Sequence, residues 1–306
     1  MRCNCPYVVC TVHGNCAACV ARSLKDGTLA HCMEETAQAL GAELPVKVPE
    51  TWLERNYEAM SLRSARLVAE AVRARPDALV SLPAGSTAAR TFQLLKEMSD
   101  AGEVDFSRAR FVALDEWLDL ADERENCNAF MMANFYGPLG INPERITRFD
   151  VHASDLAAEC RRVDEVIFEH GGIDVMLLGA GMNGHLGLNE PGGDFASYSK
   201  VVELDPVTAQ VGQKYFSEGM KLTRGITLGV RHMFDAKKVV LQIGGPHKAE
   251  IVEKIYRSAP TEKIPATVLK LLPRGVVVLD QDAASKIRDL LGEVGCLTPE
   301  GAPPVR

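Results

Sequence analysis

The sequence lacks the long hydrophobic runs that membrane proteins need. In 306 residues, no apolar segment approaches the roughly 20 residues of a membrane-spanning helix. Residues 1–6, Met-Arg-Cys-Asn-Cys-Pro, lack the hydrophobic core of a secretion signal. Internal repeats and low-complexity tracts are absent as well. We therefore expect a cytoplasmic protein that has no membrane partner.

Basic charge is also scarce. Lys and Arg number 34 against 41 Asp and Glu, which gives a formal net charge of −7, and no basic run is long enough to follow a phosphate backbone. Nucleic-acid partners are therefore not expected. The composition, 46% hydrophobic and 25% charged, is ordinary for a soluble globular protein. The length suits one large domain with a small module attached.

Cysteine is distributed unevenly, which indicates a separate N-terminal module. Six of the nine cysteines lie in the first 32 residues: Cys3, Cys5, Cys10, Cys16, Cys19 and Cys32. The Cys-x2-Cys pair at 16 and 19 suits a structural zinc ion or an iron–sulfur cluster, whose binding would supply folding energy. The ligand subset stays open, and the alternative is an incidental thiol-rich tail. We predict a metal-binding module over residues 1–42 and a second domain over residues 43–306.

Strand and helix patterns alternate along the second domain. Short apolar runs predict strands at 78–82, 110–115, 175–178, 238–243 and 275–280, and apolar residues three and four apart predict helices at 50–75, 88–98, 126–136, 156–170 and 283–291. We expect residues 208–220 to form a lid helix. The alternation predicts an α/β fold, a doubly wound, mostly parallel, Rossmann-like sheet with helices on both faces.

The segment 173–191 is the centre of the predicted site. Its strand stops at a Gly-rich bend, where Gly181 permits close approach of the backbone to a ligand. The same bend holds Asn183, His185 and Glu190, and ligands of open α/β sheets sit past the carboxyl ends of strands. An imidazole and a carboxylate there could move protons on a small substrate. The alternative is a turn whose polar groups only cap backbone amides.

Other strand ends supply complementary chemistry. The Pro-Ala-Gly-Ser-Thr turn at 83–87 precedes a helix, and its free amides and hydroxyls suit a phosphate, although Ser and Thr also cap helices for structural reasons alone. Lys248 follows another strand and suits a phosphate oxygen. Asp115 ends the strand 110–115 and is the acidic residue we expect in the site. The alternatives are a solvated lysine and a solvated acidic turn.

Five spaced motifs occur together in one known family. They are LPAGST, FVALDEW, the GxNGHLGLNEP turn, LTRGITLGV and GGPHKA. Over roughly residues 45–285 they resemble the glucosamine-6-phosphate deaminase (isomerase) family, and their wording is closest to its galactosamine-6-phosphate branch. The resemblance implies an enzyme that opens the ring of an amino-sugar 6-phosphate, shifts a proton from C2 to C1 and releases ammonia. It implies no cofactor for catalysis.

The resemblance also implies residue roles. Asp115 would be the general base at C2, His185 would handle the proton of the ring or anomeric oxygen, and Glu190 would orient that imidazole. Asn183 stands where some members carry an aspartate, which leaves it a polar orienting role. The implied phosphate and substrate pocket consists of Ala84, Gly85, Ser86, Thr87, Gly181, Lys214 and Lys248.

Three departures from the family pattern matter. Ala84 replaces a hydroxyl-bearing residue and so removes one hydrogen-bond donor. Lys214 stands roughly where an arginine helps to clamp phosphate, so the charge stays and the bidentate fork is lost. The region around Lys200 lacks the residues that bind an allosteric amino sugar in regulated members, so we predict no such regulation.

Two rival functions remain. A 6-phosphogluconolactonase has a related fold and a similar Gly-x-x-Gly-His turn, but it hydrolyses a lactone and needs no base at C2. A sugar-phosphate sensor would bind without turnover, and retention of Asp115, His185 and Glu190 together argues against it. The sequence does not decide between glucosamine and galactosamine, and it leaves homo-oligomerisation open.

Overall fold

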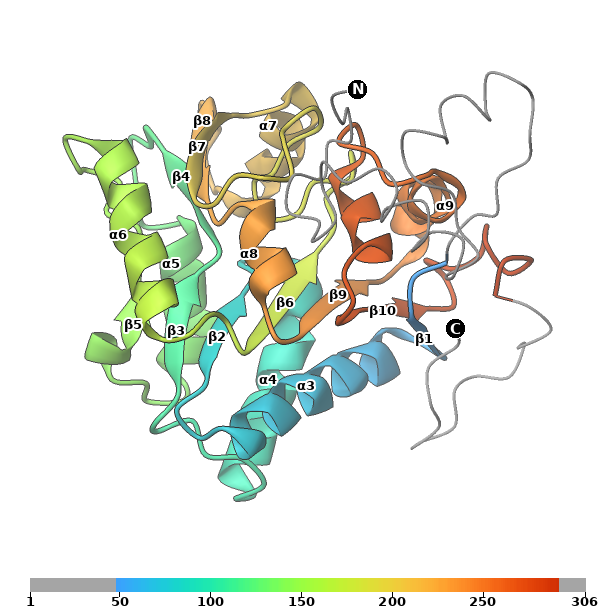
Figure 1. Cartoon of the computed structure of the whole chain (residues 1–306), viewed down its shortest axis with the longest axis horizontal. Helices are drawn as coiled ribbons and strands as arrows, with labels where there is room; N and C mark the ends of the chain where they lie inside the picture. The colour runs from blue at the N-terminus through green and yellow to red at the C-terminus, as the bar shows by residue number, and fades with distance from the viewer. Residues whose placement is uncertain (1–47, 292–306) are drawn as a thin grey trace, which may run out of the picture.

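The structure is a computed structural model that describes residues 48–291. The cysteines of the predicted metal-binding module lie outside these residues. Figure 1 shows a large sheet with helices on both faces and a small sheet beside it. Within residues 48–291, no helix has the length and apolar character that crossing a membrane requires.

Seven parallel strands form the large sheet. In spatial order they are β1 (Thr51–Glu54), β10 (Gly275–Asp280), β9 (Val239–Ile243), β6 (Val175–Gly179), β2 (Leu79–Leu82), β3 (Arg110–Ala113) and β5 (Ile146–Thr147). Every neighbouring pair is parallel. The predicted α/β fold with a mostly parallel sheet is confirmed.

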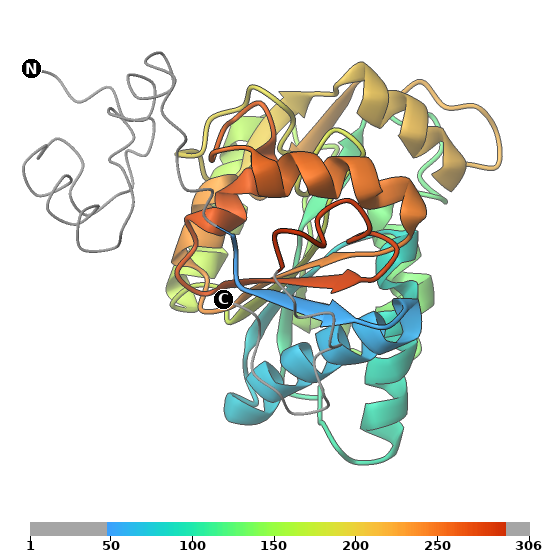
Figure 2. The same ribbon diagram turned by 90° about the vertical axis from the view of Figure 1, so that its right-hand side faces the viewer.

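Helices cover both faces of this sheet. On one side lie α3 (Tyr57–Ala74), α4 (Ala89–Asp100) and α5 (Cys127–Met131), which continues as a π-helical turn (Met132–Tyr136); on the other lie α6 (Leu156–Glu169), α8 (Val230–Asp235) and α9 (Ala249–Arg257). Figure 2 shows the sheet edge between α3 and α9. Short 3-10 turns connect the elements at Ser86–Ala88, Pro143–Arg145, Pro246–Lys248 and Pro265–Lys270.

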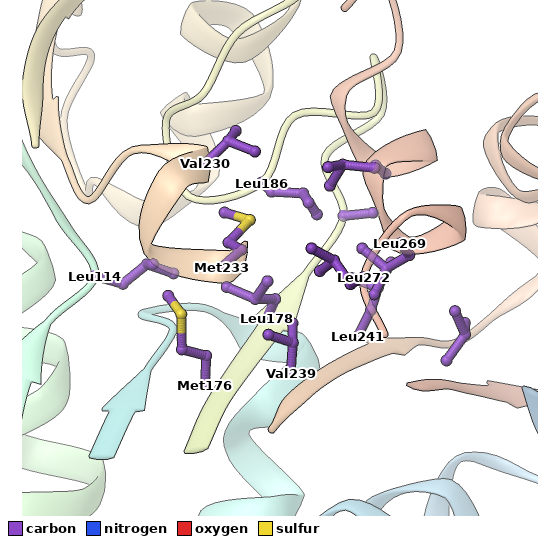
Figure 3. Packing of buried hydrophobic residues seen from close by; sticks show 14 of the residues in the cluster. Leu114, Met176, Leu178, Leu186, Val230, Met233, Val239, Leu241, Leu269 and Leu272 are labelled. Carbon is purple, nitrogen blue, oxygen red and sulfur yellow. The ribbon is translucent and has the colours of Figure 1, made fainter. Parts of the chain in front are cut away.

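Side chains alternate between two hydrophobic cores along each central strand. In β6, Val175 and Leu177 pack with α3 and α4, whereas Met176 and Leu178 pack with the helices of the opposite face. A parallel strand that is buried on both faces needs such a continuous apolar run. Figure 3 shows the second core, which Leu186 from the loop after β6 also enters.

The order of strands places a crevice in the middle of the sheet. From β2 the chain proceeds outward to β3 and β5, and from β6 it proceeds in the opposite direction to β9 and β10. The carboxyl ends of β2 and β6 therefore flank a topological switch point, which is where open α/β sheets bind ligands.

A second sheet was not predicted. It consists of the antiparallel strands β4 (Asp115–Leu118), β8 (Arg224–Thr227) and β7 (Lys200–Glu203). The prediction of one strand over residues 110–115 was wrong at its end. The strand of the large sheet stops at Ala113, and Asp115 begins β4, where it pairs with Thr227.

Two helix predictions differ from the structure: the helix at 50–75 begins later than predicted, and the helix at 283–291 does not form. Residues 51–54 form β1, and α3 begins only after Asn56, whose side-chain oxygen accepts the N–H of Ala59 at 2.9 Å. Residues 283–291 form successive turns rather than a closing helix. The segment still contributes apolar residues to the core, because Ala283, Ala284, Ile287 and Leu291 are buried.

The predicted lid helix at 208–220 is shorter and begins earlier. Helix α7 covers Pro206–Gly212, and a 3-10 turn, η4, covers Gln213–Tyr215. The side-chain amide of Gln213 donates to the carbonyl groups of Ala209 and Met220 at 3.0 and 2.8 Å. These bonds fold the chain back on itself where a longer helix was expected.

Candidate active site

A cavity lies past the carboxyl ends of β2 and β6, at the switch point. Its lining includes the predicted residues Ala84, Gly85, Thr87, Asp115, Gly181, His185, Lys214 and Lys248. Asn183 and Glu190 lie behind His185 and contact its surroundings. Ser86 is exposed on the turn, and its carbonyl accepts a hydrogen bond from Tyr57. The structure thus brings residues from five separate segments to one place.

The loop after β6 holds His185 in a fixed position. Leu186, next to it, is fully buried in the core (Figure 3) and forms isolated β-bridges with Ala180 and Asn189. Gly181 passes directly against the imidazole, so an added Cβ would overlap the ring. Gly184 has a φ of +86°, which side chains rarely adopt. The glycines of this loop therefore serve the placement of His185.

His185 takes part in a buried polar network. Its Nδ1 lies 2.9 Å from the hydroxyl oxygen of Thr208, which donates to Glu190 Oε2 at 2.9 Å. The Asn183 amide donates to Glu190 Oε2 and to the Thr208 oxygen at 3.1 and 3.2 Å. The direct separation between His185 Nδ1 and Glu190 Oε2 is 3.6 Å. Glu190 therefore reaches the imidazole through a hydroxyl group.

Asp115 borders the same loop from the small sheet. A Cβ added to Gly187, two residues after His185, would lie 3.4 Å from Asp115 Oδ2. The carboxylate thus packs against the backbone of the His185 loop while facing the cavity. Burial, with a smaller contribution from the negative charge of Glu116, raises the pKa of Asp115 to about 7. A carboxylate with a raised pKa is a stronger base.

Asp115 and Glu116 are adjacent in the sequence, but only Asp115 lines the main cavity. Glu116 is buried and accepts the backbone N–H groups of Trp117, Cys127 and Asn128, each at 2.9 Å. It caps the start of α5 and does not line the main cavity. The buried Cys127 thiol lines the cavity and hydrogen-bonds to Asp115, which lowers the pKa of that carboxyl against the larger effect of burial.

The pKa of Asp115 predicts the pH dependence of a reaction that uses it as a base. Because the base must be ionised, kcat/KM should fall about tenfold per pH unit below about pH 7. Glu116→Gln removes a like charge and should shift the acid limb to lower pH, whereas Cys127→Ala removes a hydrogen bond and should shift it to higher pH. If the acid limbs of the wild type, Glu116→Gln and Cys127→Ala coincide, the titrating group is the substrate phosphate and not Asp115.

Two lysines, Lys214 and Lys248, line the same cavity and give it positive charge. Lys248 follows β9, is buried, and donates to the carbonyl of Ala180 at 2.7 Å. Burial, and then the charge of Lys214, lower its pKa to about 8. A Cβ on Gly85 would lie 3.3 Å from the hydroxyl of Tyr215, which brings the turn after β2 against η4. An anion bound here would relieve the repulsion between the two ammonium groups.

The cavity wall also contains residues that sequence reasoning did not assign to the site, among them Thr208, Tyr215, Gln242 and Cys127. The Gln242 side chain donates to the carbonyl of Thr87 and accepts from Thr91, so it ties the turn after β2 to β9. These residues carry no local motif, and only the folded chain brings them to the site. In residues 48–291, no group of three or more His, Cys, Asp and Glu side chains could hold a metal ion.

Known proteins resemble this chain over most of its length. The family model described as glucosamine-6-phosphate isomerases/6-phosphogluconolactonase matches residues 53–277. A glucosamine-6-phosphate deaminase of Thermoanaerobacter pseudethanolicus is 36% identical over 236 residues, which cover 76% of this chain and 93% of that protein. Glucosamine-6-phosphate deaminase 1 of Bacillus subtilis is 34% identical over 233 residues, with 76% and 96% covered.

Solved structures agree with these matches. A structure described as a monomeric glucosamine-6-phosphate deaminase superposes with a TM-score of 0.74 at 32% identity and covers 78% of this chain and 99% of its own. A 6-phosphogluconolactonase of Leishmania guyanensis superposes with a TM-score of 0.62 at 19% identity, covering 78% and 99%. The second likeness shows a shared fold alone.

Proposed function

The chain belongs to the family of glucosamine-6-phosphate isomerases and 6-phosphogluconolactonases, and we propose that it is an enzyme converting an amino-sugar 6-phosphate and water to a ketohexose 6-phosphate and ammonia. One observation supports this most. Asp115 and His185 approach one cavity from different sheets, and Lys214 and Lys248 line the same cavity.

The chemistry follows from these positions. Lys214 and Lys248 bind the phosphate together with the amides of the turn at Gly85, which fixes the sugar carbons relative to the base. His185 Nε2 takes the proton of the anomeric hydroxyl and delivers it to the ring oxygen as the ring opens. Asp115 then removes the C2 proton and delivers a proton to C1, while a proton of the amino group passes to the C1 oxygen. The resulting C2 imine is hydrolysed by water, which releases ammonia.

The proposal is tested by product analysis with purified protein. Glucosamine 6-phosphate, galactosamine 6-phosphate or both should yield one ammonia per ketohexose 6-phosphate. Unphosphorylated glucosamine should react with a far lower kcat/KM, because the two lysines then have no anion to bind. Hydrolysis of 6-phosphogluconolactone without ammonia release from either amino sugar would identify a lactonase. Binding of both sugar phosphates without turnover would identify a sensor.

We also propose that the N-terminal cysteines bind a structural metal. The pair Cys16 and Cys19, with four more thiols within the first 32 residues, supports zinc or an iron–sulfur cluster. Elemental analysis of the full-length protein should find at least one metal per chain. The control is a chain with serine at both Cys16 and Cys19, which should lose metal while keeping deaminase activity. Less than one metal per chain in the wild type would count against the proposal.

A further inference from the structure

The hydroxyl of Thr208 joins three groups of the site. Thr208 is 3% exposed and lies on α7, the segment over the cavity. Its oxygen is 2.9 Å from His185 Nδ1 and 2.9 Å from Glu190 Oε2, and it accepts from the Asn183 amide at 3.2 Å. A buried hydroxyl with this many partners fixes the direction of each hydrogen bond.

The direction follows from counting protons. An ionised carboxylate only accepts, so the single Thr208 proton goes to Glu190 Oε2. The Asn183 amide and His185 Nδ1 must then both donate to the Thr208 oxygen. A neutral imidazole has one N–H, so His185 Nε2 is left bare. His185 lines the cavity, where a bare nitrogen can accept a substrate proton.

Resting on the proposed function, we propose that Thr208 is a positioning residue that holds His185 in the tautomer with a proton on Nδ1 and a lone pair on Nε2. Glu190 does not do this alone. Its Oε2 lies 3.6 Å from His185 Nδ1, beyond the range of a normal hydrogen bond. The threonine hydroxyl fills this gap and connects the ring to the carboxylate.

The backbone around Thr208 supports a fixed position. Thr208 and Lys214 belong to the continuous segment of α7 and η4, and both line the cavity. Gly212 in this segment packs so closely that an added Cβ would collide with Leu222 and approach the ring of Trp117 to 3.3 Å. The hydroxyl that contacts His185 and a lysine that lines the cavity therefore share one closely packed segment.

The test compares three substitutions on α7. Thr208→Val removes the hydroxyl at nearly constant volume, and kcat should fall about 10- to 100-fold with little change in KM. Thr208→Ser keeps the hydroxyl and should restore most of kcat. Gln210→Ala, an exposed position on the same helix, should change neither constant. A Thr208→Val enzyme with wild-type kcat would overturn the proposal, as would failure of Thr208→Ser to recover activity.

NMR spectroscopy tests the role of Thr208 independently of the proposed reaction. In ¹⁵N-histidine-labelled protein without substrate, the signals of His185, assigned by their absence in His185→Gln, should show a protonated Nδ1 in wild type and Thr208→Ser. Thr208→Val should show a mixture of tautomers. A wild-type imidazole protonated on Nε2 would refute the role of Thr208 even if ammonia is released. The expected tautomer without ammonia release would refute the proposed function alone.

Discussion

Asp115→Asn should lower kcat for ammonia release by about 10⁴-fold, the upper end of what a general base contributes. The expected loss is large because the same carboxylate removes the C2 proton and returns one at C1. Asparagine keeps the shape of the side chain and cannot accept these protons. The direct measurement is exchange of the C2 hydrogen with deuterated water by NMR, which should be abolished.

Two controls show that this variant is folded and binds its ligand. Its affinity for inorganic phosphate should be nearly unchanged, because Lys214 and Lys248, and not Asp115, supply the positive charge of the cavity. It should also be more stable than the wild type at pH 8, since burying an ionised Asp115 opposes folding. Persistent C2 exchange in a folded Asp115→Asn protein would remove this residue from the mechanism.

The sign of the stability effect follows from the pKa of Asp115. That pKa is about 7 in the folded protein and about 3.9 in an unfolded chain. Between these values the folded state binds more protons, so wild-type stability falls as pH rises through this window and stays lower above it. The difference corresponds to at most about 4 kcal/mol at pH 8. The gain of Asp115→Asn should disappear below about pH 4.

His185→Gln should lower kcat by about 10²- to 10³-fold with a cyclic amino-sugar phosphate, and by less than about tenfold with an open-chain analogue. The imidazole is needed to move the proton during ring opening, and an open-chain substrate omits this step. Glutamine retains a polar group of similar reach but does not shuttle protons near neutral pH. The comparison requires steady-state kinetics with both substrates.

The matched control for His185→Gln is Gln210→Ala on the exposed side of α7, which should leave both substrates unaffected. Equal losses with the cyclic and open-chain substrates would assign His185 a role after ring opening. A loss confined to KM would make His185 a binding residue.

The large sheet followed from the sequence because its strands are nearly continuous apolar runs. In β6 and β10, buried residues face both cores, and each run ends at a polar or glycine turn. The small sheet has no such signal. Its strands have four residues each, and they pair residues as distant as Asp115 and Thr227. These pairings are contacts between distant parts of the chain. The sequence alone therefore does not show that the chain leaves the large sheet after Ala113.

The residues of the site also divide into those with a local sequence pattern and those that only tertiary contacts bring together. His185 and Glu190 could be predicted because they share one Gly-rich bend, and Lys248 because it lies in the Gly-Gly-Pro-His-Lys turn after a strand. Thr208 and Cys127 could not, since their contacts with His185 and Asp115 join elements far apart in the chain. A lone threonine or cysteine has no spacing pattern that identifies its partner. Their roles depend on tertiary contacts alone.

The most direct test of the central claim, that Asp115 and His185 act together on one phosphorylated amino sugar, uses a substrate labelled with deuterium at C2. We predict that the wild-type protein removes the deuterium from C2, releases one ammonia per molecule, and yields a ketohexose 6-phosphate with the label at C1 or in water. Release of ammonia together with a product that still carries the deuterium at C2 would contradict the account.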